Sequence, residues 1–175
     1  MARASMAALG GASMVILASA AMAAALEPGS VQSRTFVEAA AHSDNFEILA
    51  AESALAESRD PRVRSFAQEM VDAHLQTTRE LAEATGRAGL KFPPKGMNGD
   101  QSSFLSALQS QKGVDFDKVY VKQQVLAHRA ALAVEQQYAS DGDQPELKKA
   151  AASAVPTIAA HLKMAEDMQA ALGGS

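Results

Sequence analysis

The stretch DPRVRSFAQEMVDAHLQTT, residues 60–78, combines a helix start with one continuous apolar helical face. Asp60 is a favoured N-cap residue, and Pro61 suits the first position of a helix. The apolar side chains that follow recur every three or four residues, which is the period of an amphipathic helix: Phe66, Ala67, Met70, Val71, Leu75 and Leu81. His74 stands in the middle of this face, where the pattern calls for an apolar residue.

The chain on both sides of this stretch is also typical of long helices. Aromatic residues make up only 5% of the chain, and Gly and Pro gather in a few places, which favours helices over strands. Long helices are predicted over 33–58, 61–88, 115 or 117 to 140, and 145–172, with a short helix over 101–111. We expect Asp115 or Asp117 to cap the third long helix, and Pro156 to kink the last one near 152–155.

The connections between the helices predict an all-α, up-down four-helix bundle. The short turns RDPR and DGDQ, at 59–62 and 141–144, force their flanking helices into two antiparallel hairpins. The longer connection GLKFPPKGMNGD, 89–100, joins the hairpins and leads into the short extra helix. A single domain is therefore expected over 33–172, after a short linker over 26–32; a domain-swapped or dimeric bundle of the same helices is the alternative, so a homo-oligomer stays open.

The first residues, MARASMAALGGASMVILASAAMAAALEP, have the pattern of a secretory signal peptide. Arg3 precedes an apolar, alanine-rich run that carries no charge until Glu27, and A-x-A sites end at Ala23 and Ala25. We expect residues 1–25 to form a signal peptide that is cleaved after Ala23 or after Ala25, and the protein to be exported, either to the periplasm or to the extracellular space. An uncleaved membrane anchor is the alternative. The chain contains no cysteine, which excludes disulfides and a lipid anchor on cysteine.

The charge pattern argues against two classes of partner. The formal net charge is −4, and charges of both signs are mixed along the chain with no basic block, so nucleic-acid binding is not expected. No second long apolar segment follows residue 25, so the mature chain is expected to lack a transmembrane segment.

Each predicted long helix carries one residue of a metal-ligating type inside its apolar stripe. These residues are Glu47, His74, His128 and His161. Helical rise places Glu47 and His74 at similar distances from the turn that joins their helices, roughly 16 and 20 Å. Imidazole and carboxylate groups bind first-row metals, so the pattern predicts a site for a single Zn, Cu or Fe ion in the bundle core. The neighbouring thioethers of Met70, Met164 and Met168 favour copper.

The same four residues also fit a purely structural role. Glu47 could pair with His74, and His128 with His161, to fix the register of the helices. The protein would then be a non-enzymatic periplasmic stress or partner-binding protein. An enzyme has the least support, because the chain contains no Gly-rich phosphate loop, H-E-x-x-H or G-x-S-x-G motif.

The order of several short motifs resembles a family of exported bacterial proteins of unknown function, often labelled predicted outer membrane proteins. The motifs cover about residues 33–170: FVEAA (36–40), DNFEILA (44–50), DPRVRSFAQEMVDAH (60–74), DFDKVY (115–120), LAHR (126–129) and VPTIAAHL (155–162). The resemblance implies a ferritin-like four-helix bundle and supplies no activity. The family's recurring polar positions correspond here to Glu47, Asp72, His74, Asp117, His128 and His161.

This sequence departs from the pattern of ferritin-like di-iron proteins. Those proteins carry E-x-x-H on two helices, whereas the residues three positions before the histidines here are Val71, Val125 and Ile158. A di-iron centre is therefore not expected, and a mononuclear site or no metal fits better. Asp72 lies about 200° around its helix from His74, so it is expected to face away from that site.

Overall fold

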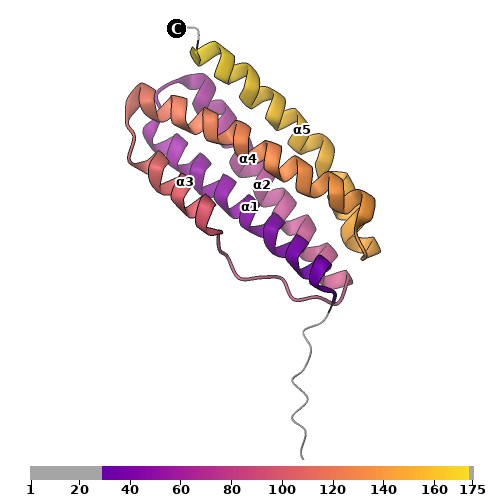
Figure 1. The fold of residues 1–175 in the computed structure, drawn as a ribbon. Helices are drawn as coiled ribbons and strands as arrows, with labels where there is room; N and C mark the ends of the chain where they lie inside the picture. Colours follow the sequence, from indigo (N-terminus) through magenta and orange to yellow (C-terminus); the bar gives the residue numbers. More distant parts are fainter. Residues whose placement is uncertain (1–28, 174–175) are drawn as a thin grey trace, which may run out of the picture.

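The structure, a computed structural model, describes residues 29–173, and all regular secondary structure within them is α-helical. Figure 1 shows four long helices lying alongside one another and a short one beside them. The helices are α1 (Val31–Glu57), α2 (Pro61–Arg87), α3 (Gly99–Gln109), α4 (Gly113–Asp141) and α5 (Pro145–Gly173). The predicted signal peptide over 1–25 lies outside the described residues.

The predicted first hairpin is present, and its two helices start with side-chain caps. Ser30 caps α1 by accepting a hydrogen bond from the backbone N–H of Ser33. Asp60 caps α2 in the same way through the N–H of Arg62, with Pro61 in the first turn, so the predicted start of this helix is confirmed. Three residues separate α1 from α2, and the two helices pack along their length.

The second hairpin, α4 and α5, packs on the first through α1 against α4 and α2 against α5. The helix α5 continues unbroken through Pro156. The long connection between α2 and α3 runs back beside the bundle, and α3 lies along α1 and α4 (Figure 1). Asn98 and Gln101 form a reciprocal capping box that starts α3 two residues earlier than predicted.

The expectation that Asp115 or Asp117 caps the third long helix was wrong. The helix α4 begins at Gly113, and its N-cap residue, Lys112, makes no side-chain cap hydrogen bond. Glu57, at the end of α1, instead accepts hydrogen bonds from the Gly113 N–H and the Lys112 ammonium group. The cap comes from another helix because packing brings the end of α1 to the start of α4.

The apolar core has two parts, with the polar residues of interest between them. The larger cluster contains Phe46, Met70, Tyr120 and Val125 with their neighbours, and the smaller one contains Phe36, Leu81, Tyr138 and Ala151. The rings of Phe36 and Tyr138 stack with centroids 3.9 Å apart. Along each long helix, the predicted ligand residue falls between members of the two clusters. A buried polar layer thus divides the core.

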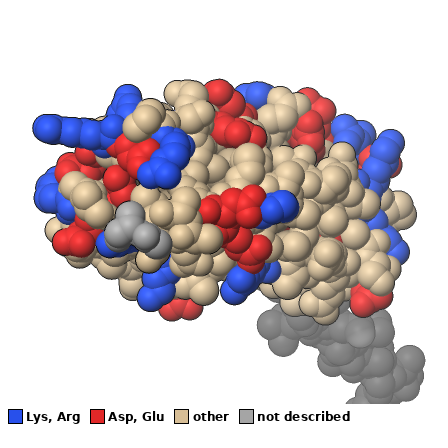
Figure 2. Space-filling model, turned by 90° about the horizontal axis from the view of Figure 1, so that it is seen from above, with Lys and Arg blue, Asp and Glu red and all other residues tan. Residues whose placement is uncertain are grey.

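The described region has no membrane-spanning helix, and the face drawn in Figure 2 has no single basic patch. None of the helices within residues 29–173 is long and apolar enough to cross a membrane. Figure 2 shows Lys and Arg interspersed with Asp and Glu, with uncharged areas between them.

Candidate metal centre

The side chains of His74, His128 and His161 meet in the centre of the bundle. They come from α2, α4 and α5. One ring nitrogen can be chosen from each side chain so that the three atoms all lie within 4.8 Å of one another. The ring centroids are 5.6 to 5.9 Å apart. All three residues are at least nine-tenths buried, with exposed fractions of 1 to 4%. Two hairpins that are separate in sequence therefore contribute to one cluster.

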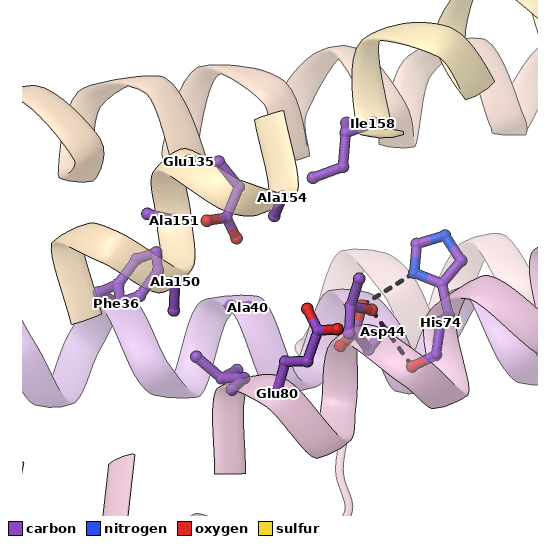
Figure 3. A pocket seen from close by; sticks show the side chains of 12 residues that line it. Phe36, Ala40, Asp44, His74, Glu80, Glu135, Ala150, Ala151, Ala154 and Ile158 are labelled. Carbon is purple, nitrogen blue, oxygen red and sulfur yellow. Dashed lines mark hydrogen bonds and ion pairs between the residues drawn. The ribbon is translucent and has the colours of Figure 1, made fainter. Parts of the chain in front are cut away.

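The orientation of His74 is held by a carboxylate from α1. The Nδ1 atom of His74 lies 2.8 Å from Oδ1 of Asp44, and Figure 3 shows the imidazole pointing toward that carboxylate. Thr77 and Thr78 donate their hydroxyl groups to the two oxygens of Asp44, at 2.9 and 3.0 Å. A carboxylate only accepts hydrogen bonds, so Nδ1 of His74 is the donor, and Nε2 becomes an acceptor in the neutral imidazole.

The second histidine is oriented by the backbone of its own helix. Nδ1 of His128 lies 3.0 Å from the carbonyl oxygen of Gln124. Because a carbonyl can only accept, Nδ1 is the donor and Nε2 carries the lone pair. His161 is held less tightly: its Nε2 lies 3.8 Å from the half-exposed carboxylate of Glu69.

The remaining ring nitrogens have no hydrogen-bond partner within the described part of the chain. They are Nε2 of His74, Nε2 of His128 and Nδ1 of His161, and all three are fully buried. Buried polar atoms in proteins are almost always hydrogen-bonded. Three unsatisfied nitrogen atoms in one cluster are the arrangement that a metal ion would satisfy, with Asp44 and the Gln124 carbonyl holding the opposite nitrogens.

Glu47 lies next to this cluster but outside the group of close ligand atoms. Its Oε2 accepts a hydrogen bond of 2.5 Å from Nε2 of Gln124, and its Oε1 lies 3.6 Å from Nδ1 of His128. That nitrogen is the one that already faces the Gln124 carbonyl. Burial raises the pKa of Glu47 to about 7, although the nearby His74 opposes this shift.

The electrostatics favour neutral imidazoles at two of the three positions. Burial, together with the neighbouring histidines, lowers the pKa of His128 and of His161 to about 4. For His74, burial also opposes the charged form, but the hydrogen bond to Asp44 and the charge of Glu47 outweigh it and raise its pKa. His128 and His161 are therefore in the metal-binding form at neutral pH, whereas His74 holds its proton more tightly than an ordinary imidazole and must release it before Nε2 can bind a metal.

The two hydrogen-bonded pairs expected for a purely structural role are not formed, and their members make other contacts. Neither Glu47 with His74 nor His128 with His161 forms a hydrogen bond within residues 29–173. Asp44 lies one turn before Glu47 in the same helix, and no role was predicted for it from the sequence. Its partners, Thr77 and Thr78, follow His74 by three and four residues, a helical spacing that is the available signal for them.

The methionines and Asp72, which were also considered from the sequence, lie away from the three-histidine cluster. Met70, Met164 and Met168 pack in or against the larger apolar cluster. Asp72 is exposed and accepts from Gln68, as its position on the helix predicted. His42, the remaining histidine of the chain, is half-buried because the connection between α2 and α3 passes over it at Gly96.

Two comparisons with known proteins give a family and a fold. The family model described as "Domain of unknown function (DUF4142)" matches residues 18–168. The crystal structure of a DUF305 fragment from Deinococcus radiodurans is similar to this chain with a TM-score of 0.70 and 18% identity, covering 85% of this chain and 99% of that one. No curated protein matches the sequence. The structural likeness supports the helical fold.

Proposed function

The chain belongs to the DUF4142 family, a domain of unknown function, and we propose that it binds one metal ion through His74, His128 and His161. The observation that carries this proposal is the group of three buried, unpartnered ring nitrogens within one cluster. Three imidazole ligands suit Zn, Cu or Fe and leave a coordination position for a further ligand. The absence of E-x-x-H favours a mononuclear site over a di-iron one, and the apolar packing of Met70, Met164 and Met168 removes the argument for copper in particular.

Glu47 is a second buried carboxylate beside the proposed site, in addition to Asp44, whose oxygens are already engaged by His74, Thr77 and Thr78. In this position it would offset the positive charge of a bound ion, either directly or across the Gln124 amide. Glu69, which lies beside His161 and is about half exposed, lines together with His161 an open hollow at the surface between α2 and α5. This hollow is the proposed entry route for the ion.

Metal analysis tests the proposal directly. Full-length protein without a polyhistidine tag is stripped with chelator, incubated with Zn, Cu or Fe, and measured for bound metal by mass spectrometry. We expect about one ion per chain for the wild type and for His42→Ala, and substantially less for His74→Ala, His128→Ala and His161→Ala. Equal metal content in the wild type and the three cluster variants would show that the cluster is not the site.

A structural role for the polar layer is the second candidate function. The specific observation in its favour is that Asp44 joins α1 to His74, Thr77 and Thr78 of α2, which would fix the register of the hairpin. The protein would then be a non-enzymatic stress or partner-binding protein of the cell envelope. In that case chelator and added metal leave the thermal unfolding curve unchanged.

We further propose that the protein is exported and that its four long helices form a ferritin-like bundle. The charge-free, alanine-rich start of the sequence supports export, and the pairing of two antiparallel hairpins by a long connection supports the bundle type. Intact-mass measurement of protein from the periplasm tests the first point, since cleavage after Ala23 or after Ala25 gives distinct masses.

A further inference from the structure

A cavity lies beside the three-histidine cluster, between α1, α3 and α4. Its volume is about 400 Å³, which is within the range of small-molecule sites. Alanine and other apolar side chains make up most of its wall, and Phe104, Leu126 and Val134 in this wall remain 36 to 44% exposed. The cavity is thus mainly apolar and reachable from solvent.

The polar group that distinguishes this cavity is the carboxylate of Glu135. Glu135 is only 7% exposed, yet it makes no hydrogen bond or ion pair with any residue in the described range 29–173. It lines the large cavity and also a neighbouring one of about 30 Å³. Figure 3 shows its side chain reaching from α4 into that smaller cavity, toward α1 and α2. The oxygens of Glu135 are not among the fully buried unpartnered atoms of the described residues, so they are accessible from the cavity, where a cationic ligand would be a stronger partner than water.

The charges around the cavity indicate the sign of the ligand. Its lining includes the acidic residues Asp44, Asp100 and Glu135, and none of the lining residues within the described chain is Lys or Arg. The oxygens of Asp44 already accept hydrogen bonds from His74 and two threonines. Glu135 is therefore the buried carboxylate that is available to a ligand. Burial, reinforced by the charge of Asp44, raises the pKa of Glu135 to about 8, and a cationic partner would favour the ionised form.

We propose that this cavity binds a small organic amine, with its ammonium group against the Glu135 carboxylate and its apolar part along the alanine-lined face of α4. The ammonium group supplies the hydrogen-bond donors and the charge that Glu135 lacks. The apolar part covers surface that is now in contact with water. His74 lines the cavity, whereas His128 and His161 do not. The inference does not require a bound metal, because Glu135, the group that would bind the amine, is not one of the proposed metal ligands.

Three probes of similar shape and different charge test the proposal: phenethylamine, 2-phenylethanol and 3-phenylpropionate. Each is titrated into the full chain at neutral pH, with NMR resonances of Phe104, Leu126 and Val134 as the readout. We expect the amine to shift these resonances and to bind at least about tenfold more tightly than the alcohol. Equal binding of the alcohol or the anion, or no shift with the amine at millimolar concentration, would overturn the proposal.

Matched variants separate the charge of Glu135 from a general negative field. Glu135→Gln keeps the shape and is expected to weaken amine binding about tenfold or more. Glu80→Gln is the control, because Glu80 lines only the smaller cavity, is exposed, and already accepts a hydrogen bond from Gln76. Amine binding by Glu135→Gln with wild-type affinity would contradict the proposal.

A second pair of variants keeps the test valid if Glu135→Gln fails to fold. Ala131→Phe fills the cavity and should abolish amine binding, whereas Ala133→Phe changes an exposed alanine that does not line it. Retained binding in Ala131→Phe would overturn the assignment. His161→Ala is expected to lose metal and keep amine binding, so failure of the metal proposal and failure of this one give different results.

Discussion

At the scale of single residues, Asp44 determines which nitrogen of His74 faces the cluster. Its carboxylate is fixed by Thr77 and Thr78 and faces Nδ1 of His74, so Nε2 of His74 is the atom left unpartnered. Residues that orient a metal-binding histidine in this way are expected to matter almost as much as the ligand itself.

Replacing Asp44 by Asn should weaken metal binding without removing a ligand. The amide keeps the shape but loses the charge that holds the Nδ1 proton of His74, so we expect an affinity loss of about 10- to 100-fold. Competition with a chromogenic chelator measures the affinity. The exposed Asp72→Asn is the control and should bind like the wild type. An Asp44→Asn variant with unchanged affinity would show that the imidazole is oriented by packing alone.

Glu135 makes the stability of the metal-free protein depend on pH. Its pKa is raised to about 8 from an ordinary value of 4.5, chiefly by burial. The folded state therefore holds this proton more tightly than the unfolded state, and stability falls as the pH rises from about 4.5 through 8. Urea denaturation at pH 5 and pH 8 measures this effect. The free energy of unfolding should fall more between these two pH values for the wild type than for Glu135→Gln. The exposed Glu52→Gln should follow the wild type.

At the scale of elements, the two hairpins start their helices in different ways. The α2 start is local, since Asp60 accepts from an N–H two residues later. The α4 start is tertiary, since Glu57 of α1 accepts from Gly113. A sequence pattern detects the first kind of cap and misses the second, because the N-cap position of α4, Lys112, has no suitable side chain of its own.

The two aspartates give a direct comparison of these helix starts. Asp60→Ala removes an N-cap and should lower the free energy of unfolding by about 1 kcal/mol. Asp115→Ala removes only a charge in the first turn of α4, where it interacts with the helix dipole, and should cost about 0.3–1 kcal/mol at low salt. Chemical denaturation in low and high salt distinguishes the two: the Asp115 loss should disappear at high salt, whereas the hydrogen bond from the Arg62 N–H to Asp60 should leave part of the Asp60 loss in place. Equal, salt-independent losses would mean that Asp115 also acts as a cap.

At the scale of the whole molecule, the histidine cluster connects the two hairpins. His74 comes from the first hairpin, and His128 and His161 come from the second. The larger and smaller apolar clusters lie on either side of this layer. A bound ion would thus act as a cross-link at the middle of the bundle, where the ring nitrogens are otherwise unsatisfied.

Metal should therefore stabilise the whole fold. If the ion binds only the folded chain, a concentration 100 times its Kd adds about 2.7 kcal/mol to the free energy of unfolding. Thermal unfolding of the full chain, with and without Zn or Cu, measures the effect. His42→Ala should respond like the wild type, and His128→Ala should show a much smaller shift. An identical Tm with chelator and with metal would instead favour the structural role of the polar layer.

The sequence by itself determined the helices and the residues that interrupt their apolar faces. Apolar spacing, Asp60 with Pro61, and the short turns depend on neighbours three or four positions apart. These local signals predicted the long helices to within a few residues at most ends, and they placed a ligand-type residue in the core stripe of each. The order of the motifs also indicated the family that the comparison confirmed.

Only the tertiary structure decided which of those residues meet and which atoms they present. The contact between Asp44 and His74 spans 30 positions in sequence, and that between Glu47 and Gln124 spans 77. Such contacts depend on the register and rotation of packed helices, which a periodic pattern leaves undetermined. For that reason the sequence predicted four equivalent ligands, whereas packing places three histidines in one cluster and sets Glu47 beside it.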